Sequence, residues 1–123
     1  MLIGVIDDDV RMLESIGEWL AAAGYEAHLF ETAGAFLLDD ACEKVACIIA
    51  DVGLPGISGI ELIAVLKARG RIIPVILITG RDTSEIETTC RQAGAFALRA
   101  KPFDPSEMIR LLRRATSQQG SKP

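Results

Sequence analysis

Four short apolar runs of this sequence each end at polar side chains that can take part in catalysis or ligand binding. The run Leu2–Ile6 is followed by three aspartates, Asp7, Asp8 and Asp9. The other three runs are each followed by one polar residue: Asp51 after Val45–Ala50, Thr79 after Ile73–Ile78, and Lys101 after Phe96–Ala100. Apolar runs of this length are typical of buried strands. In a parallel sheet the carboxyl ends of the strands meet at one edge, where ligands bind. We therefore expect carboxylates, a hydroxyl and an ammonium group to converge there.

These groups together predict phosphoryl-transfer chemistry. Three carboxylates in one crevice repel one another, so at least one is expected to have a raised pKa unless a cation binds. Mg²⁺ suits such a site because it takes a few carboxylate oxygens and keeps water or phosphate oxygens as its other ligands. Lys101 adds a fixed positive charge, and the hydroxyl of Thr79 can donate to an oxyanion. One aspartate then acts as the nucleophile and forms an acyl phosphate.

Amphipathic segments between the apolar runs predict the helices that hold this edge in place. They extend from Val10 to Gly24, Thr32 to Asp40, Ser58 to Arg69, Thr83 to Ala93 and from Asp104 onward, and Glu26–Phe30 alternates as a further strand. Ser58 and Glu61 fit a capping box, and Asp9 is interpreted as the acid that begins the first helix rather than as a third ligand. The pattern predicts an α/β protein, a (βα)5 doubly wound sheet of five parallel strands.

The composition indicates one globular domain. The chain has 123 residues, 50% of them apolar, and a net charge of −4, which argues against a nucleic-acid surface. Residues 1–117 are predicted to form the domain, and residues 118–123 a polar tail or the start of a linker. No apolar run approaches the ~20 residues of a membrane span, and the start is not a secretory signal. Cys42, Cys47 and Cys90 form no C-x-x-C pair, so reduced thiols and a cytoplasmic location are expected.

Four motifs stand in order between residue 2 and about residue 116. They are Val5-Ile6-Asp7-Asp8-Asp9, Asp51 with the following Leu54-Pro55-Gly56-Ile57-Ser58-Gly59, Ile78-Thr79-Gly80, and Lys101-Pro102-Phe103. On these motifs the sequence resembles the receiver domain of two-component response regulators, and its first and third motifs are most similar to the FixJ-type branch. The resemblance implies a flavodoxin-like, CheY-like form of the predicted fold.

The resemblance also implies a role for each residue at the polar edge. Asp51 is then the phosphoacceptor, and a histidine kinase is the partner that supplies the phosphoryl group. Asp8 and Asp51 bind Mg²⁺ directly together with the backbone carbonyl of Gly53, whereas Asp7 holds the ion through water. Lys101 pairs with the phosphoryl group.

A switch and further partners follow from the same resemblance. Thr79 swings toward the phosphoryl group and changes the surface formed by the helix near Thr83–Ala93, the strand Phe96–Ala100 and the last helix. That surface is implied as the contact for a homodimer or another partner. A C-terminal effector domain outside these residues is also implied, whereas direct contact of this domain with nucleic acid or membrane is not. The Lys101-Pro102 peptide bond is expected to be cis.

Two positions near the fifth strand depart from the family pattern. Leu98 replaces the usual aromatic residue that moves with the threonine, so we expect the switch to act through Thr79 and the Gly80–Ser84 loop. Arg99 replaces an aliphatic residue on the side of Lys101, and it needs an acidic partner or a position at an edge. The helix over Thr83–Ala93 offers few inward apolar groups, which fits a mobile signalling element.

Two positions are predicted to control access of water to the acyl phosphate. Gly53 leaves no side chain over the phosphoryl group, and Arg81 is placed to lean over it.

Other functions compete with a phosphorylated receiver. Leu98 and Arg99 suit a degenerate receiver that binds partners without phosphorylation, although the intact polar edge argues against this alternative. Asp7-x-Asp9 faintly resembles the nucleophile motif of haloacid dehalogenase phosphatases, but Arg11 stands where that motif has Thr or Val. Nucleotide binding is disfavoured because the turn after the first strand holds aspartates, which repel a pyrophosphate, rather than glycines.

Overall fold

The structure is a computed structural model and describes residues 1–80 and 83–120. Its sheet contains five parallel strands in the order β2-β1-β3-β4-β5. The strands are β1 (Leu2–Ile6), β2 (Glu26–Phe30), β3 (Cys47–Asp51), β4 (Val75–Thr79) and β5 (Ala97–Ala100). The prediction of a doubly wound (βα)5 sheet is therefore confirmed.

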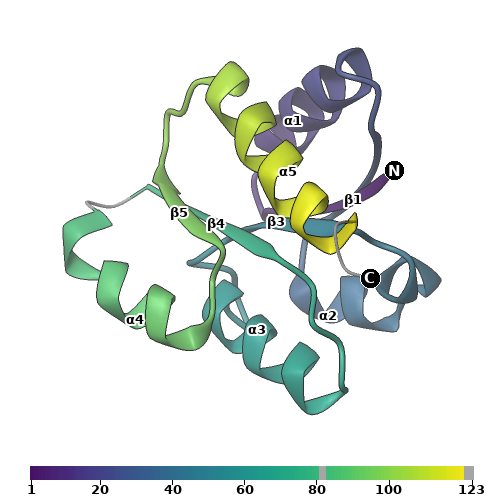
Figure 1. The fold of residues 1–123 in the computed structure, drawn as a ribbon. Coiled ribbons are helices and arrows are strands. Elements are labelled where there is room, and N and C mark those ends of the chain that lie inside the picture. The colour runs from purple at the N-terminus through teal and green to yellow at the C-terminus, as the bar shows by residue number, and fades with distance from the viewer. Residues whose placement is uncertain (81–82, 121–123) are drawn as a thin grey trace.

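Helices cover both faces of the sheet (Figure 1). They are α1 (Val10–Ala22), α2 (Ala33–Leu38), the 3₁₀ turn η1 (Asp40–Glu43), α3 (Gly59–Ala68), the 3₁₀ turn η2 (Thr83–Glu85), α4 (Glu87–Ala93) and α5 (Pro105–Gly120). Helices α1 and α5 lie on one face, and α2, α3 and α4 lie on the other. Each face holds its own apolar core, which explains why β1, β3 and β4 are apolar on both sides.

Side-chain caps fix where several helices begin. Asp9 accepts hydrogen bonds from the first amides of α1 and so is its N-cap, as predicted. The capping box at α3 is complete, because Ser58 Oγ accepts from the Glu61 amide at 3.1 Å and Glu61 Oε1 accepts from the Ser58 amide at 2.9 Å. Asp104 Oδ1 accepts from the Ser106 amide at 2.9 Å at the start of α5. These caps fix the residues at which α1, α3 and α5 begin.

Some element boundaries differ from the sequence prediction. The second helix ends at Leu38 rather than at Asp40, because the carboxylate of Asp39 accepts from the Ala41 amide at 2.8 Å and begins a 3₁₀ turn. The segment Thr83–Ala93 is divided into η2 and α4, and the N-cap Ile86 makes no side-chain capping bond. Each of the last three strands begins one or two residues later than predicted. None of these shifts moves a strand-end polar residue.

Two further predictions concern the end of the chain and the thiols. Helix α5 continues to Gly120, into the segment expected to be a polar tail, and residues 121–123 lie outside the described residues. Cys42, Cys47 and Cys90 are free and buried, so the expectation of unpaired thiols is confirmed. Within residues 1–80 and 83–120, no helix combines the length and the apolar character needed to cross a bilayer.

Candidate functional site

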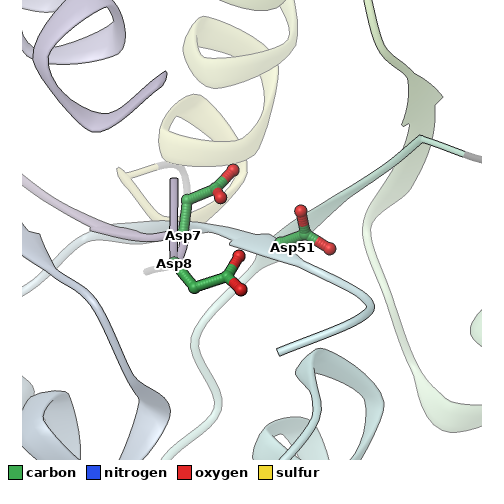
Figure 2. Close-up of side chains that lie close together, drawn as sticks. All are labelled: Asp7, Asp8 and Asp51. Atoms are coloured by element: carbon green, nitrogen blue, oxygen red, sulfur yellow. The ribbon is translucent and has the colours of Figure 1, made fainter. Parts of the chain in front are cut away.

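The carboxylates of Asp7, Asp8 and Asp51 meet at the carboxyl ends of β1 and β3. One oxygen from each lies within 4.8 Å of the others, and Figure 2 shows the three groups together at this edge. Neighbouring strands make this possible, because β1 and β3 pair directly although their ends are far apart in sequence. Asp9 is not in the cluster, since its side chain caps α1.

Lys101, which follows β5 at the same edge of the sheet, contacts two of these carboxylates. Its Nζ donates to Asp51 Oδ2 at 2.6 Å and to Asp7 Oδ2 at 2.9 Å. Burial opposes the charge of the ammonium group, but the bonds to Asp51 and Asp7 outweigh it and raise the pKa of Lys101. The Lys101-Pro102 bond is cis, as expected. The lysine is therefore held as a permanent cation among the acids.

Asp7 has the raised pKa that the sequence led us to expect, but for a different main reason. Its side chain is fully buried, and this burial raises the pKa more than any other cause. A hydrogen bond from the Asp9 amide at 2.9 Å and the contact with Lys101 oppose the increase, while repulsion by Asp51 contributes least. Removal from water disfavours the charged form of Asp7 more than repulsion by the neighbouring carboxylates does.

Asp51 is held by backbone contacts as well as by the lysine. Its Oδ1 accepts from the Gly53 amide at 2.7 Å, so both of its oxygens have donors. A Cβ at Gly59, the first residue of α3, would lie 2.6 Å from the Asp51 carbonyl oxygen and 2.9 Å from Leu77. Only glycine allows this close approach of α3. Gly59 is thus a supporting residue of the site, with a role that its sequence position alone does not reveal.

A hollow of about 450 Å³ lies beside Asp51. It is lined by Val52 and Gly53 from the loop after β3, by Thr79 and Gly80 at the end of β4, and by Ile86 at the start of α4. Thr79 is buried, with 3% of its surface exposed. The hollow gives a phosphoryl-sized group room next to the carboxylate, and Ile86 adds an apolar wall that the sequence did not predict.

The donor set at this edge fits a hard divalent cation. All three clustered side chains offer carboxylate oxygens, and neither histidine nor cysteine belongs to the cluster. Mg²⁺ prefers such oxygens and keeps several of its waters, which suits an edge where Asp8 is exposed and Asp51 is half-buried. The buried carboxylate of Asp7 would also be stabilised by a nearby positive ion.

The two departures on β5 lie beside this site. Arg99 Nε donates to Glu107 Oε1 on α5 at 2.7 Å, and its Nη1 donates to the Leu98 carbonyl at 2.8 Å. Of the two environments expected for Arg99, an acidic partner or a position at an edge, the structure shows the acidic partner. Leu98 is half-buried against the core beneath α4. Arg81, predicted to lean over the site, lies outside the described residues.

The fold agrees with comparisons to known proteins. The family model of the response regulator receiver domain matches residues 3–113. The chain therefore belongs to the response regulator receiver domains, the signalling domains of two-component systems.

Individual relatives support the same assignment. The chain is 34% identical to the transcriptional regulatory protein FixJ of Bradyrhizobium diazoefficiens over 94% of this chain and 57% of FixJ. It is 32% identical to the response regulator protein TodT of Pseudomonas putida over 93% of this chain and 50% of TodT. The chain thus spans about half the length of these curated relatives. The match to FixJ confirms the predicted FixJ-like type.

Solved structures show the same fold. Full-length FixJ from B. japonicum superposes with a TM-score of 0.86 at 33% identity, covering 98% of this chain and 59% of that one. The BeF3-activated DrrB receiver domain gives a TM-score of 0.82 at 31% identity, covering 94% of this chain and 97% of that one. The CheY-like receiver domain protein of Methanospirillum hungatei JF-1 superposes with a TM-score of 0.87 at 28% identity, covering 99% of this chain and 98% of that one. Together with the flavodoxin-like strand order β2-β1-β3-β4-β5, this confirms the expected form of the fold.

Proposed function

We propose that Asp51 is the phosphoacceptor of this receiver domain. The observation that carries the proposal is the position of its carboxylate, 2.6 Å from the ammonium group of Lys101 and at the mouth of a hollow of about 450 Å³. A nucleophile needs a free path to its target, and this hollow supplies one. The side chain is also 14% exposed, which leaves it accessible to a docked donor.

Mg²⁺ is proposed as the cofactor. Asp8, Asp51 and the backbone carbonyl of Gly53 would bind it directly, and Asp7 would hold it through water. When bound, the ion neutralises phosphoryl oxygens and lowers the repulsion between donor and acid. The chain's own contribution is to hold the carboxylates within 4.8 Å of one another before the ion arrives.

The proposed reaction transfers a phosphoryl group from a phosphohistidine of the kinase. An oxygen of Asp51 attacks phosphorus, the new P–O bond forms, and the P–N bond breaks with its electron pair left on the imidazole nitrogen. Lys101 releases Asp51 Oδ2 and follows the developing charge on the phosphoryl oxygens. The same side chains assist loss of the group when water attacks.

The switch is proposed to begin at Thr79. Its hydroxyl turns toward the phosphoryl oxygens and draws with it the segment that leads to α4. Leu98 has no aromatic ring or polar group that could move together with Thr79. A movement of α4 would therefore change the surface formed by α4, β5 and α5. This surface would then contact a second copy or an effector domain, joined after the receiver unit of residues 1–117. Residues 118–123 would begin the linker. A cytoplasmic location is proposed for the whole protein.

Phosphorylation by a small-molecule donor tests the proposal. The chain is incubated with acetyl phosphate and Mg²⁺, and intact mass and peptide mapping are recorded. We expect one phosphoryl group on Asp51, none in Asp51→Asn, and normal labelling in Asp40→Asn, which removes an exposed acid on η1. Loss of labelling when a chelator removes Mg²⁺ would support the proposal that phosphorylation requires this ion. An unmodified chain, or equal labelling of Asp51→Asn, would favour the degenerate receiver that acts as a phosphorylation-independent interaction module.

A further inference from the structure

The hollow beside Asp51 has room for more than the phosphoryl group that it would receive. Its volume is about 450 Å³, whereas one water molecule takes up about 30 Å³ in the liquid. A phosphoryl group has few heavy atoms, so several water molecules would fit beside it. Water in this space can attack the phosphorus atom. The lining of the hollow therefore bears on how long an acyl phosphate on Asp51 lasts.

Most residues that line the hollow place no bulky side chain in it. Gly53 and Gly80 have no side chain, and a Cβ built on Gly80 would meet no atom of the described residues within 4 Å. Thr79 offers a hydroxyl, which stabilises charge on phosphoryl oxygens rather than excluding water. The aliphatic side chains among the described lining residues are those of Val52 and Ile86. Shielding of the acyl phosphate from water must come from these two.

Val52 and Ile86 reach the hollow from elements that are held differently. Val52 directly follows Asp51, and its amide donates to the Ile78 carbonyl at 2.8 Å, which fixes it to the end of β4. Ile86 stands at the start of α4, where no side chain caps the helix and where Cys90 is the buried residue. Few apolar contacts hold such an element. The distance of Ile86 from Asp51 therefore depends on how α4 packs.

The position of Ile86 is set by contacts on both sides of it. Its side chain is partly buried and packs against the apolar core beneath α2, α3 and α4. Its amide donates to the Thr83 carbonyl at 3.2 Å, and its carbonyl accepts from the Cys90 amide at 2.9 Å. The backbone of Ile86 thus joins η2 to the first turn of α4. Its side chain forms an apolar wall of the hollow that is carried by α4.

We propose that Ile86 shields the acyl phosphate of Asp51 from water and so controls how long the phosphoryl group lasts. This inference rests on the proposed role of Asp51. In the loss reaction, the oxygen of a water molecule attacks phosphorus, and the bond from phosphorus to the Asp51 oxygen breaks with its electron pair returning to the carboxylate. One proton of the water stays on the inorganic phosphate, and the other passes to solvent. An aliphatic side chain offers this water no hydrogen bond, so it lowers the population of water placed for attack.

The lifetime of the phosphorylated chain tests the proposal. The chain is labelled with radioactive acetyl phosphate and Mg²⁺, excess donor is removed, and loss of label from Asp51 is followed. Ile86→Ala widens the hollow and removes its apolar wall, so we expect loss of label to be at least about threefold faster. Ile86→Leu keeps an aliphatic side chain of equal size and should stay within about twofold of the unchanged chain.

Two control variants separate shielding from a general loosening of the core or of α4. Ile73→Ala removes the same atoms from a partly buried residue of the same core that precedes β4, at the end away from the hollow, and should leave the lifetime unchanged. Cys90→Ala loosens α4 but leaves Ile86 in the wall, so it should speed the loss of label less than Ile86→Ala does.

The outcomes distinguish this inference from the proposed function. A lifetime of Ile86→Ala that equals or exceeds that of the unchanged chain would overturn the shielding role and leave the role of Asp51 intact. The same acceleration in Ile86→Leu, Ile73→Ala or Cys90→Ala as in Ile86→Ala would also overturn it. A chain that takes up no label on Asp51 would overturn the proposed function and this inference with it.

Discussion

Helix α5 buries four apolar side chains against one face of the sheet, whereas α4, on the other face, buries Cys90 alone among its described residues. The four in α5 are Met108, Leu111, Leu112 and Ala115. Asp104 caps the start of α5, but the start of α4 has no side-chain cap. The two helices border the same strand, β5. An element held by so little apolar surface can change its packing at small cost, while a firmly held neighbour keeps the site in register.

The largest expected effect is a loss of stability when a buried side chain of α5 is shortened. Leu112→Ala removes a side chain with no exposed surface, and we expect it to lower the free energy of unfolding by about 3 kcal/mol. Cys90→Ala, the matched change in α4, is expected to lower the free energy of unfolding by about 1 kcal/mol because the side chain is small. Urea denaturation measures both. Equal costs would show that the two helices are held alike.

Thiol labelling of the unmodified chain sharpens the same comparison. Cys90 is the buried residue of α4, and Cys47 lies in the core beneath α1 and α5. Opening of α4 exposes Cys90 without unfolding the domain, so we expect it to react at least about tenfold faster than Cys47 in native buffer. Mass spectrometry of timed samples assigns the sites. Equal rates for the two thiols would mean that α4 opens only with the rest of the molecule.

The pH dependence of stability follows from the buried thiol on the α5 side. Burial raises the pKa of Cys47 from 9.0 to about 12. Between these values the unfolded chain loses this proton and the native state keeps it, so the free energy of unfolding falls as pH rises. The fall approaches about 1.4 kcal/mol per pH unit above pH 9 relative to Cys47→Ala. Denaturation series at several alkaline pH values test this, and parallel curves for the two proteins would contradict it.

The smallest expected effect concerns the tether between α3 and α4. Lys67 Nζ donates to the Ala93 carbonyl at 2.9 Å at the end of α4. Because Lys67 is exposed, Lys67→Met should change global stability by less than about 0.5 kcal/mol. Amide exchange in α4 should nevertheless quicken, while α5 stays unchanged. Lys44→Met, another exposed lysine, is the control, and an unaffected α4 would exclude Lys67 as a tether.

The sequence predicted the positions of the site residues because strand ends and helix caps are local signals. Asp7, Asp8, Asp51 and Lys101 each follow an apolar run, so parallel pairing alone brings them together. The 3₁₀ turn η1 after Asp39 was not predicted. The side chain of this residue ends α2 and caps the next turn, and the sequence pattern does not separate these two roles from a continuous helix.

Other features depend on contacts between distant segments. The sequence did not predict that Glu107 is the acidic partner of Arg99, because the two residues meet only when α5 packs against β5. It also did not predict the close approach of Gly59 to the backbone of Asp51, which depends on how α3 packs against the sheet. The main cause of the raised pKa of Asp7 could not be predicted either. The apolar pattern predicts a buried strand, but it does not show how completely the carboxylate that follows the strand is removed from water.

The bridge from Lys101 to Asp7 and Asp51 links positions 94 and 50 residues apart. The acids lie on strands from the first half of the chain, and the cation comes from the last strand, so the charge balance of the pocket is complete only after β5 has docked. A chain whose final strand has not joined the sheet would carry the Asp7 and Asp51 carboxylates without their counter-charge. The charge pairing of this pocket therefore depends on completion of the fold.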